Sequence, residues 1–138
     1  TMLITLRRAG HVLALCSNGP EDYVNTALDA HDLRTFFQGV KCGGMGYDGK
    51  VDMVRDLVTQ CRIANADIRA TIVIGDREDD VLAAHKNGAL AVGATYGFGS
   101  PHELARADAH VSCPEAIPET VKKLLTRVPS PPPPQTWR

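Results

Sequence analysis

The sequence predicts an α/β domain built on a doubly wound, Rossmann-like parallel sheet. Short continuous apolar runs, rich in β-branched residues, recur along the chain, and segments with helical periodicity separate them. Such runs are typical of parallel strands, because helices cover both faces of a parallel sheet. Strands that alternate with helices favour the doubly wound arrangement. The strongest predicted strands are residues 12–16, 71–75 and 89–93, and weaker candidates are residues 39–42 and 109–112.

Helices are predicted between and after these strands. Apolar positions share one helical face in residues 24–31, 51–61 and 117–128. Pro20 fits the first turn of a helix, and Asn87-Gly88 fits a helix end. Residues 100–103 and 112–115 both have the pattern of a capping box with a proline just inside, which predicts two further helix starts.

Length and net charge limit the number of domains and the kinds of binding partner that the protein can have. The 138 residues suffice for one domain, which we place at residues 1–127. Residues 128–138 include four consecutive prolines, which have no N–H to donate, so we expect a disordered tail or a ligand for a proline-binding domain. Lys plus Arg number 15 and Asp plus Glu 16, a net charge of −1. This balance argues against a nucleic-acid or anionic-membrane binder.

The cysteines and the hydropathy pattern indicate the compartment. Cys16, Cys42, Cys61 and Cys113 form no Cys-x-x-Cys pair, so we expect free thiols in a reducing cytoplasm rather than a zinc site, although the sequence leaves a disulfide open. No apolar run approaches the ~18 residues of a membrane helix, and no signal peptide opens the chain. We therefore expect a cytoplasmic protein.

Small polar residues follow the first strong strand. Ser17, Asn18 and Gly19 stand where a helix is expected to begin. Ligands of α/β sheets bind beyond the carboxyl ends of the strands, and the free N–H groups of a helix N-terminus attract phosphate. These three residues are therefore candidates for binding a phosphate group. The alternative is a structural turn in which a side chain caps the helix.

Charged residues follow at other element ends. Asp76 and Asp80 belong to a run with four acids in five positions after the strand 71–75, and they can face the same way. Their oxygens suit Mg²⁺, or else they favour the dipole of a helix start. Lys50 begins a predicted helix, where a cation opposes the dipole, so an anionic partner or solvent exposure must explain it. Residues 96–100 border the same site or form a plain loop.

Taken in order, these elements resemble the haloacid dehalogenase superfamily, in its phosphoglycolate phosphatase-like branch. The resemblance covers residues 3–125 and implies that Ser17 binds the transferring phosphoryl group and that Lys50 neutralises its charge. It also implies that Asp76 is a Mg²⁺ ligand and that Asp80 supports the metal less directly. The implied function is that of a Mg²⁺-dependent phosphomonoesterase acting on a small phosphorylated metabolite.

The family's first motif does not occur in the 138 residues. That motif is a strand ending in Asp-x-Asp-x-Thr, whose first Asp is the nucleophile, and residues 1–10 instead resemble the helix before the second motif. We therefore expect a C-terminal part of the catalytic core, which is inactive by itself and works through an aspartyl-phosphate only in the full-length protein. Mg²⁺ should bind weakly without the first-motif carboxylates.

The missing strand is the central one of the family's sheet. The resemblance therefore predicts either a gap or a new pairing of its neighbours, with self-association or strand swapping to cover unpaired backbone groups. Two other functions stay open, namely a non-catalytic remnant that binds a partner protein or a phosphorylated ligand, and a dehalogenase. A receiver-type phosphoacceptor domain does not fit, because in that family the acids precede the hydroxyl and the lysine.

Overall fold

Residues 2–127 are described by the computed structural model, and they alternate strands with helices as predicted. The helices are α1 (Met2–Arg8), α2 (Glu21–Ala30), α3 (Lys50–Ala64), α4 (Glu78–Lys86) and α5 (Ile117–Thr126). The strands are β1 (Ala14–Pro20), β2 (Gly39–Gly43), β3 (Ile72–Gly75), β4 (Leu90–Ala94) and β5 (Ala109–Val111). Short 3-10 turns span Arg34–Phe36 and Pro114–Ala116. The predictions for residues 128–138 lie outside the described residues.

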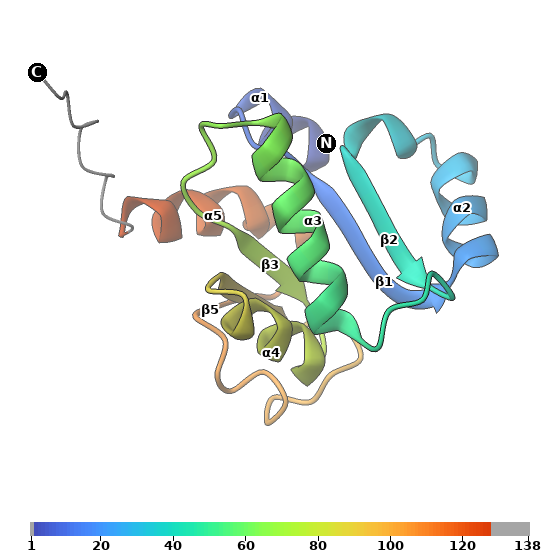
Figure 1. Ribbon diagram of the computed structural model, residues 1–138. Helices are drawn as coiled ribbons and strands as arrows, with labels where there is room; N and C mark the ends of the chain where they lie inside the picture. Colours follow the sequence, from blue (N-terminus) through green and yellow to red (C-terminus); the bar gives the residue numbers. More distant parts are fainter. Residues whose placement is uncertain (1, 128–138) are drawn as a thin grey trace, which may run out of the picture.

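All strand pairs are parallel, but the strands form two sheets. β1 pairs with β2, while β3, β4 and β5 form a second sheet in that order (Figure 1). Within residues 2–127, β1 and β3 are not paired with each other, so each has one edge without a strand partner. The resemblance allowed a gap or a new pairing at this position, and the structure leaves the two strands unpaired.

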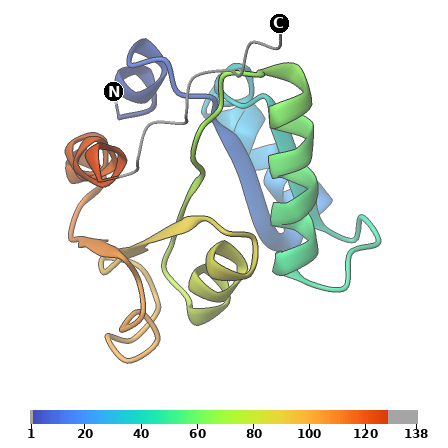
Figure 2. The same ribbon diagram turned by 60° about the vertical axis from the view of Figure 1, so that its left-hand side comes forward.

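Helices cover both sides of the two sheets. α3 and α4 pack against each other on one side, where α3 contacts β1 and β2 and α4 contacts β3 and β4. α1 and α5 contact each other on the opposite side (Figure 2). Successive residues of β1 point to opposite sides, because Leu15 packs in a cluster with α2 whereas the thiol of Cys16 lies 3.7 Å from Sδ of Met53 in α3.

Apolar contacts hold the two sheets in place. One buried cluster joins α1 and α5 to β4 and β5. Partly buried Leu13, just before β1, and Ile72, at the start of β3, pack against it. A second cluster joins α4 to β4 and includes the fully buried Leu104. None of the helices within residues 2–127 is both long and apolar enough to cross a membrane.

The first strand is longer than predicted. β1 continues to Pro20, so residues 17–19 lie within the strand, and α2 begins at Glu21 with no side-chain cap. The register of β1 against β2 shifts after Cys16, which accommodates the irregular end of the strand. The alternative of a structural cap formed by residues 17–19 is therefore wrong.

The capping box at residues 100–103 is wrong as a prediction of a helix start, whereas helical structure does begin at Pro114 after the second one. Ser100 and Glu103 exchange the two hydrogen bonds of a box, at 3.0 and 3.3 Å, yet the chain forms only turns there. By Asp108 the backbone is already bonded to β4, which leaves too few residues for a helix to propagate. Residues 112–115 lead into a tight 3-10 turn with no side-chain cap, and α5 begins only at Ile117.

Candidate active site

The start of α3 meets the start of α4 through a buried ion pair. Lys50 is the first residue of α3, and its Nζ lies 2.6 Å from Oδ1 of Asp80 in the first turn of α4. Only 13% and 8% of the two side-chain surfaces are exposed. Burial favours loss of the ammonium proton, but the hydrogen bond and charge of Asp80 outweigh it and raise the pKa of Lys50. Lys50 is therefore not a solvent-exposed lysine, and its partner is Asp80.

Both carboxylate oxygens of Asp80 are engaged. Oδ1 faces Lys50, while Oδ2 accepts a hydrogen bond from the backbone N–H of Arg77 at 3.1 Å. The side chain therefore closes the first turn of α4 as well as binding the lysine. Gly75 precedes this turn, and a Cβ at Gly75 would overlap the Asp80 carboxylate. Glycine is required at the end of β3 because the carboxylate approaches the backbone so closely.

Asp76 follows β3 directly and is held by the loop after β4. Its Oδ2 accepts a hydrogen bond from the backbone N–H of Phe98 at 2.8 Å. Residues 96–100 therefore border the candidate site. Within residues 2–127, no hydrogen bond reaches the other carboxylate oxygen of Asp76. This oxygen is free for another ligand.

Ser17, Asn18 and Gly19 form the β1 side of the site. Oγ of Ser17 accepts a hydrogen bond from the N–H of Gly19 at 3.0 Å, so the hydroxyl proton is not used in this contact. The side-chain amide of Asn18 donates to Oδ2 of Asp79 at 2.8 Å. This bond joins the end of β1 to the start of α4. It brings the carboxyl ends of the two unpaired strands together.

An open hollow adjoins these residues. It has a volume of about 380 Å³ and is lined by Asn18, Pro20, Glu21, Asp22, Gly43 and Gly44. It lies beyond the carboxyl ends of β1 and β2, where ligands bind in α/β sheets. A larger hollow of about 530 Å³ lies between α1 and α5, and it includes His11, which precedes β1. That second hollow is therefore at the amino end of the strand.

The structure adds two residues that sequence reasoning did not select for the site. The carboxylate of Asp79 accepts a hydrogen bond from the amide of Asn18, and the thiol of Cys16 lies 3.7 Å from Sδ of Met53 in α3, within reach of the charge of Lys50. In the loop 96–100, which was expected to border the site, the N–H of Phe98 is the group that binds Asp76. Burial raises the pKa of the Cys16 thiol, and the charge of Lys50 opposes this shift. The place of the loop 96–100 after a parallel strand at the same sheet edge was the signal that predicted its position. The contacts of Asp79 and Cys16 depend on packing between distant elements.

A family model matches the segment that contains most of this site. Residues 49–124, more than half of the chain, match the model described as HAD-hydrolase-like, in which HAD stands for haloacid dehalogenase. The chain belongs to this family. The resemblance predicted from the motifs is thereby confirmed.

Curated relatives of this HAD-family chain are phosphoglycolate phosphatases. The enzyme of Vibrio cholerae serotype O1 is 29% identical over 126 residues, covering 91% of this chain and 53% of the relative. That of Agrobacterium fabrum is 30% identical over 96 residues, covering 70% of this chain and 41% of the relative. The relatives support the phosphoglycolate phosphatase-like branch. The chain spans about half the length of the curated relatives it matches.

Solved structures share the fold. A predicted phosphatase from Clostridium acetobutylicum has a TM-score of 0.70 at 28% identity, covering 88% of this chain and 57% of that chain. An archaeal β-phosphoglucomutase from Pyrococcus sp. strain ST 04 has a TM-score of 0.75 at 19% identity, covering 91% and 54%. The second likeness shows the fold alone. Together they confirm the predicted Rossmann-like α/β core.

Proposed function

We propose that Ser17, Lys50 and Asp76 form the phosphate-binding and metal-binding part of a Mg²⁺-dependent phosphomonoesterase similar to phosphoglycolate phosphatase. The observation that carries this proposal is the buried Lys50–Asp80 ion pair beside Asp76, at the strand ends of a HAD-family fold. The proposed substrate is a small phosphorylated metabolite. A cytoplasmic location remains a prediction.

Two side chains have the chemistry to bind a phosphoryl group. Lys50 has three N–H donors, one of which faces Asp80, so the others can reach a phosphate oxygen. Oγ of Ser17 accepts a bond from Gly19 and keeps its own proton to donate. Asn18 lines the open hollow of about 380 Å³ at the end of β1, and Gly19 follows it in the strand. Together these groups would neutralise and orient a phosphate.

The carboxylate of Asp76 suits a hard cation. One of its oxygens is fixed by Phe98, and the other has no hydrogen-bond partner within residues 2–127. Asp80 instead supports the site through Lys50, because both of its oxygens are engaged. A bound Mg²⁺ would neutralise charge on the phosphate. No group of three or more His, Cys, Asp or Glu side chains that could hold a metal occurs in residues 2–127, so we expect weak binding.

Turnover needs a nucleophile in addition to these residues. The 138 residues contain no Asp-x-Asp-x-Thr motif. We propose that in a full-length protein an Asp carboxylate attacks phosphorus, its new O–P bond replaces the bond to the leaving alkoxide, and water then hydrolyses the aspartyl-phosphate. The 138 residues would be the C-terminal part of that core. The second candidate is a remnant that binds a phosphorylated ligand without hydrolysing it, for which the groups of Ser17 and Lys50 would suffice.

Phosphate binding tests the proposal directly. We would titrate the 138-residue chain with inorganic phosphate in the presence of Mg²⁺ and follow backbone NMR shifts. Ser17→Ala and Lys50→Met should both weaken binding, because each removes a donor. Thr59→Ala, which removes an exposed hydroxyl on α3, is the matched control and should bind as the wild type does. Equal binding by all four proteins would contradict the proposed site.

Sequencing the native transcript upstream of the codon for Thr1 would distinguish the two candidate functions. An in-frame apolar strand ending in Asp-x-Asp-x-Thr supports the phosphatase, and the longer protein should then hydrolyse 2-phosphoglycolate. A start codon at this point without that segment favours the non-catalytic remnant, which should bind phosphate without turnover.

A further inference from the structure

The loop between β4 and β5 lies directly on Asp76. The N–H of Phe98 donates to Oδ2 of Asp76 at 2.8 Å. Gly99 lies against the backbone of the same residue, because a Cβ at Gly99 would overlap the carbonyl oxygen of Asp76. This close contact means that any shift of the loop also changes the hydrogen bond to the Asp76 carboxylate.

One carboxylate ties this loop to the start of α4. Oε2 of Glu103 accepts a hydrogen bond from the backbone N–H of Ser100 at 3.0 Å. Oε1 accepts one from Nε of Arg77 at 2.9 Å, and the N–H of Glu78 lies 3.5 Å from the same oxygen. Glu103 therefore connects the end of the loop to the residue that follows Asp76.

Glu103 is itself firmly placed. Its own N–H donates to Oγ of Ser100 at 3.3 Å, which closes a second bond to the loop. The next residue, Leu104, is fully buried in the cluster between α4 and β4. The carbonyl oxygen of Leu104 lies 2.7 Å from Nε2 of His110 in β5. The backbone next to Glu103 is thus anchored to the hydrophobic core and to β5.

We propose that Glu103 is a positioning residue for Asp76. By holding Ser100 and Arg77 on either side, it keeps the N–H of Phe98 on one carboxylate oxygen of Asp76 and leaves the other directed at a cation. Partners that orient a metal-binding carboxylate change metal affinity by about 10–100-fold. The metal in this inference rests on the proposed function, whereas the contacts of Glu103 do not.

The test uses the 138-residue chain and two measurements. The first is the exchange rate of the Phe98 amide proton with water, and the second is the Mg²⁺ affinity followed by NMR shifts of the Asp76 region. Glu103→Ala should speed exchange at Phe98 by about tenfold with little change in β4, because opening is local. It should also weaken Mg²⁺ binding by about 10–100-fold.

Two variants serve as controls. Glu103→Gln keeps one oxygen for the N–H of Ser100 but replaces the oxygen that accepts from Arg77 with a donating amide group, so it should restore only part of the Phe98 protection. Glu119→Ala removes an exposed carboxylate on α5 and should behave as the wild type does. Unchanged exchange at Phe98 in Glu103→Ala would overturn the proposal. So would faster exchange at all amides together with a lower melting temperature, since that pattern indicates general destabilisation.

Failure of the proposed function has a separate signature. If the wild type binds no Mg²⁺ and Asp76→Asn gives the same titration, the metal-binding function is wrong, and a metal-positioning role for Glu103 is wrong with it. The Phe98 amide then still reports whether Glu103 holds the loop. If Mg²⁺ binds to the wild type but binds equally well to Glu103→Ala, only the positioning role is overturned.

Discussion

The charge of Lys50 is already compensated before any ligand arrives. Its Nζ faces Asp80 at 2.6 Å in surroundings that exclude most solvent. An unpaired ammonium at this depth would be costly, so the ion pair is what allows a lysine at the start of α3. An incoming phosphate would share the lysine with Asp80. If Lys50 binds phosphate as proposed, the pair would link stability and ligand binding in one contact.

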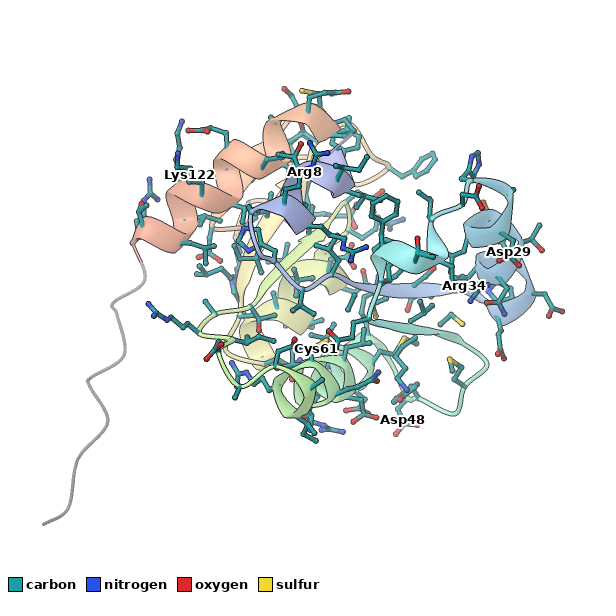
Figure 3. The ribbon with its side chains drawn as sticks, turned by 90° about the horizontal axis from the view of Figure 1, so that it is seen from above. Arg8, Asp29, Arg34, Asp48, Cys61 and Lys122 are labelled. Carbon is teal, nitrogen blue, oxygen red and sulfur yellow. The ribbon has the colours of Figure 1, made fainter. Side chains whose placement is uncertain are left out.

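Replacing Lys50 should destabilise the fold. Lys50→Met leaves the Asp80 carboxylate buried without its cation, and we expect the free energy of unfolding to fall by about 3 kcal/mol. Urea denaturation measures this change. Arg34→Met is the control, because the Arg34–Asp29 pair is exposed, with 49% and 68% of the side-chain surfaces accessible (Figure 3). That variant should lose less than about 1 kcal/mol, and equal losses would contradict the expectation.

The glycine at the end of β3 should resist substitution. Gly75→Ala places a methyl group on the Asp80 carboxylate, so the carboxylate must move away from Lys50. We expect a loss of about 1–3 kcal/mol in the free energy of unfolding, measured by urea denaturation. Gly49→Ala is the control at the start of α3, since a Cβ there meets nothing within 4 Å. A Gly75→Ala protein as stable as Gly49→Ala would count against this close contact.

At the scale of elements, local patterns predicted the strands and most helices. The helix end at Asn87-Gly88 is correct, because α4 stops at Lys86 and Gly88 has a φ of +70°. Both hydrogen bonds of the capping box at Ser100 are present, but no helix follows them. A capping box stabilises the first turn of a segment, whereas further helical turns form only if the residues that follow are not held in another structure. Here the backbone joins β4 by Asp108.

Asp108 connects three elements and should make their stability depend on pH. Its Oδ2 accepts the N–H of Ala91 in β4 at 2.7 Å and faces Nε2 of His85 in α4 at 3.0 Å. Burial disfavours the charged form, but the hydrogen bonds from Ala91 and His85 outweigh burial and hold the pKa of Asp108 below its ordinary value of 3.8. A lowered pKa stabilises the fold above that value, and the stabilisation is lost as pH falls through the lowered pKa.

The Asp108→Asn variant tests this dependence. It should be less stable than the wild type at neutral pH, and the difference should shrink as the pH falls below 3.8. Thermal unfolding across this range is the measurement. Asp67→Asn, in an exposed loop, should follow the wild type at every pH. A constant difference between Asp108→Asn and the wild type would contradict the role of the carboxylate.

The whole molecule is organised around a divided sheet. β1 and β3 each have one edge without a strand partner within residues 2–127, although helices cover both sides of the sheets. Ile74 in β3 is 37% exposed, which is unusual for a parallel strand covered by helices. Unpaired edges with exposed apolar side chains favour pairing with another chain. The contacts of Asn18 and Lys50 with α4 hold the two sheets together at their carboxyl ends.

We therefore expect the isolated chain to self-associate. Light scattering after size exclusion should give a mass above the 14.9 kDa of one chain, increasing with concentration. Ile74→Lys should reduce association, because it places a charge at the unpaired edge of β3. Ile63→Lys, at an exposed position on α3, is the matched control. A compact monomer that unfolds cooperatively at all concentrations would contradict this expectation.

The sequence by itself determined the type and order of the elements and the family, because apolar runs, helical faces and short motifs are local patterns. Only the tertiary structure decided which candidate residues touch. Asn18 meets Asp79 across 61 positions, Lys50 meets Asp80 across 30, and Phe98 meets Asp76 across 22. It also decided that β1 and β3 stay unpaired. The loop 96–100 was expected at this edge of the sheet, but the individual contacts depend on how helices and strands pack together, and no spacing along the chain encodes them.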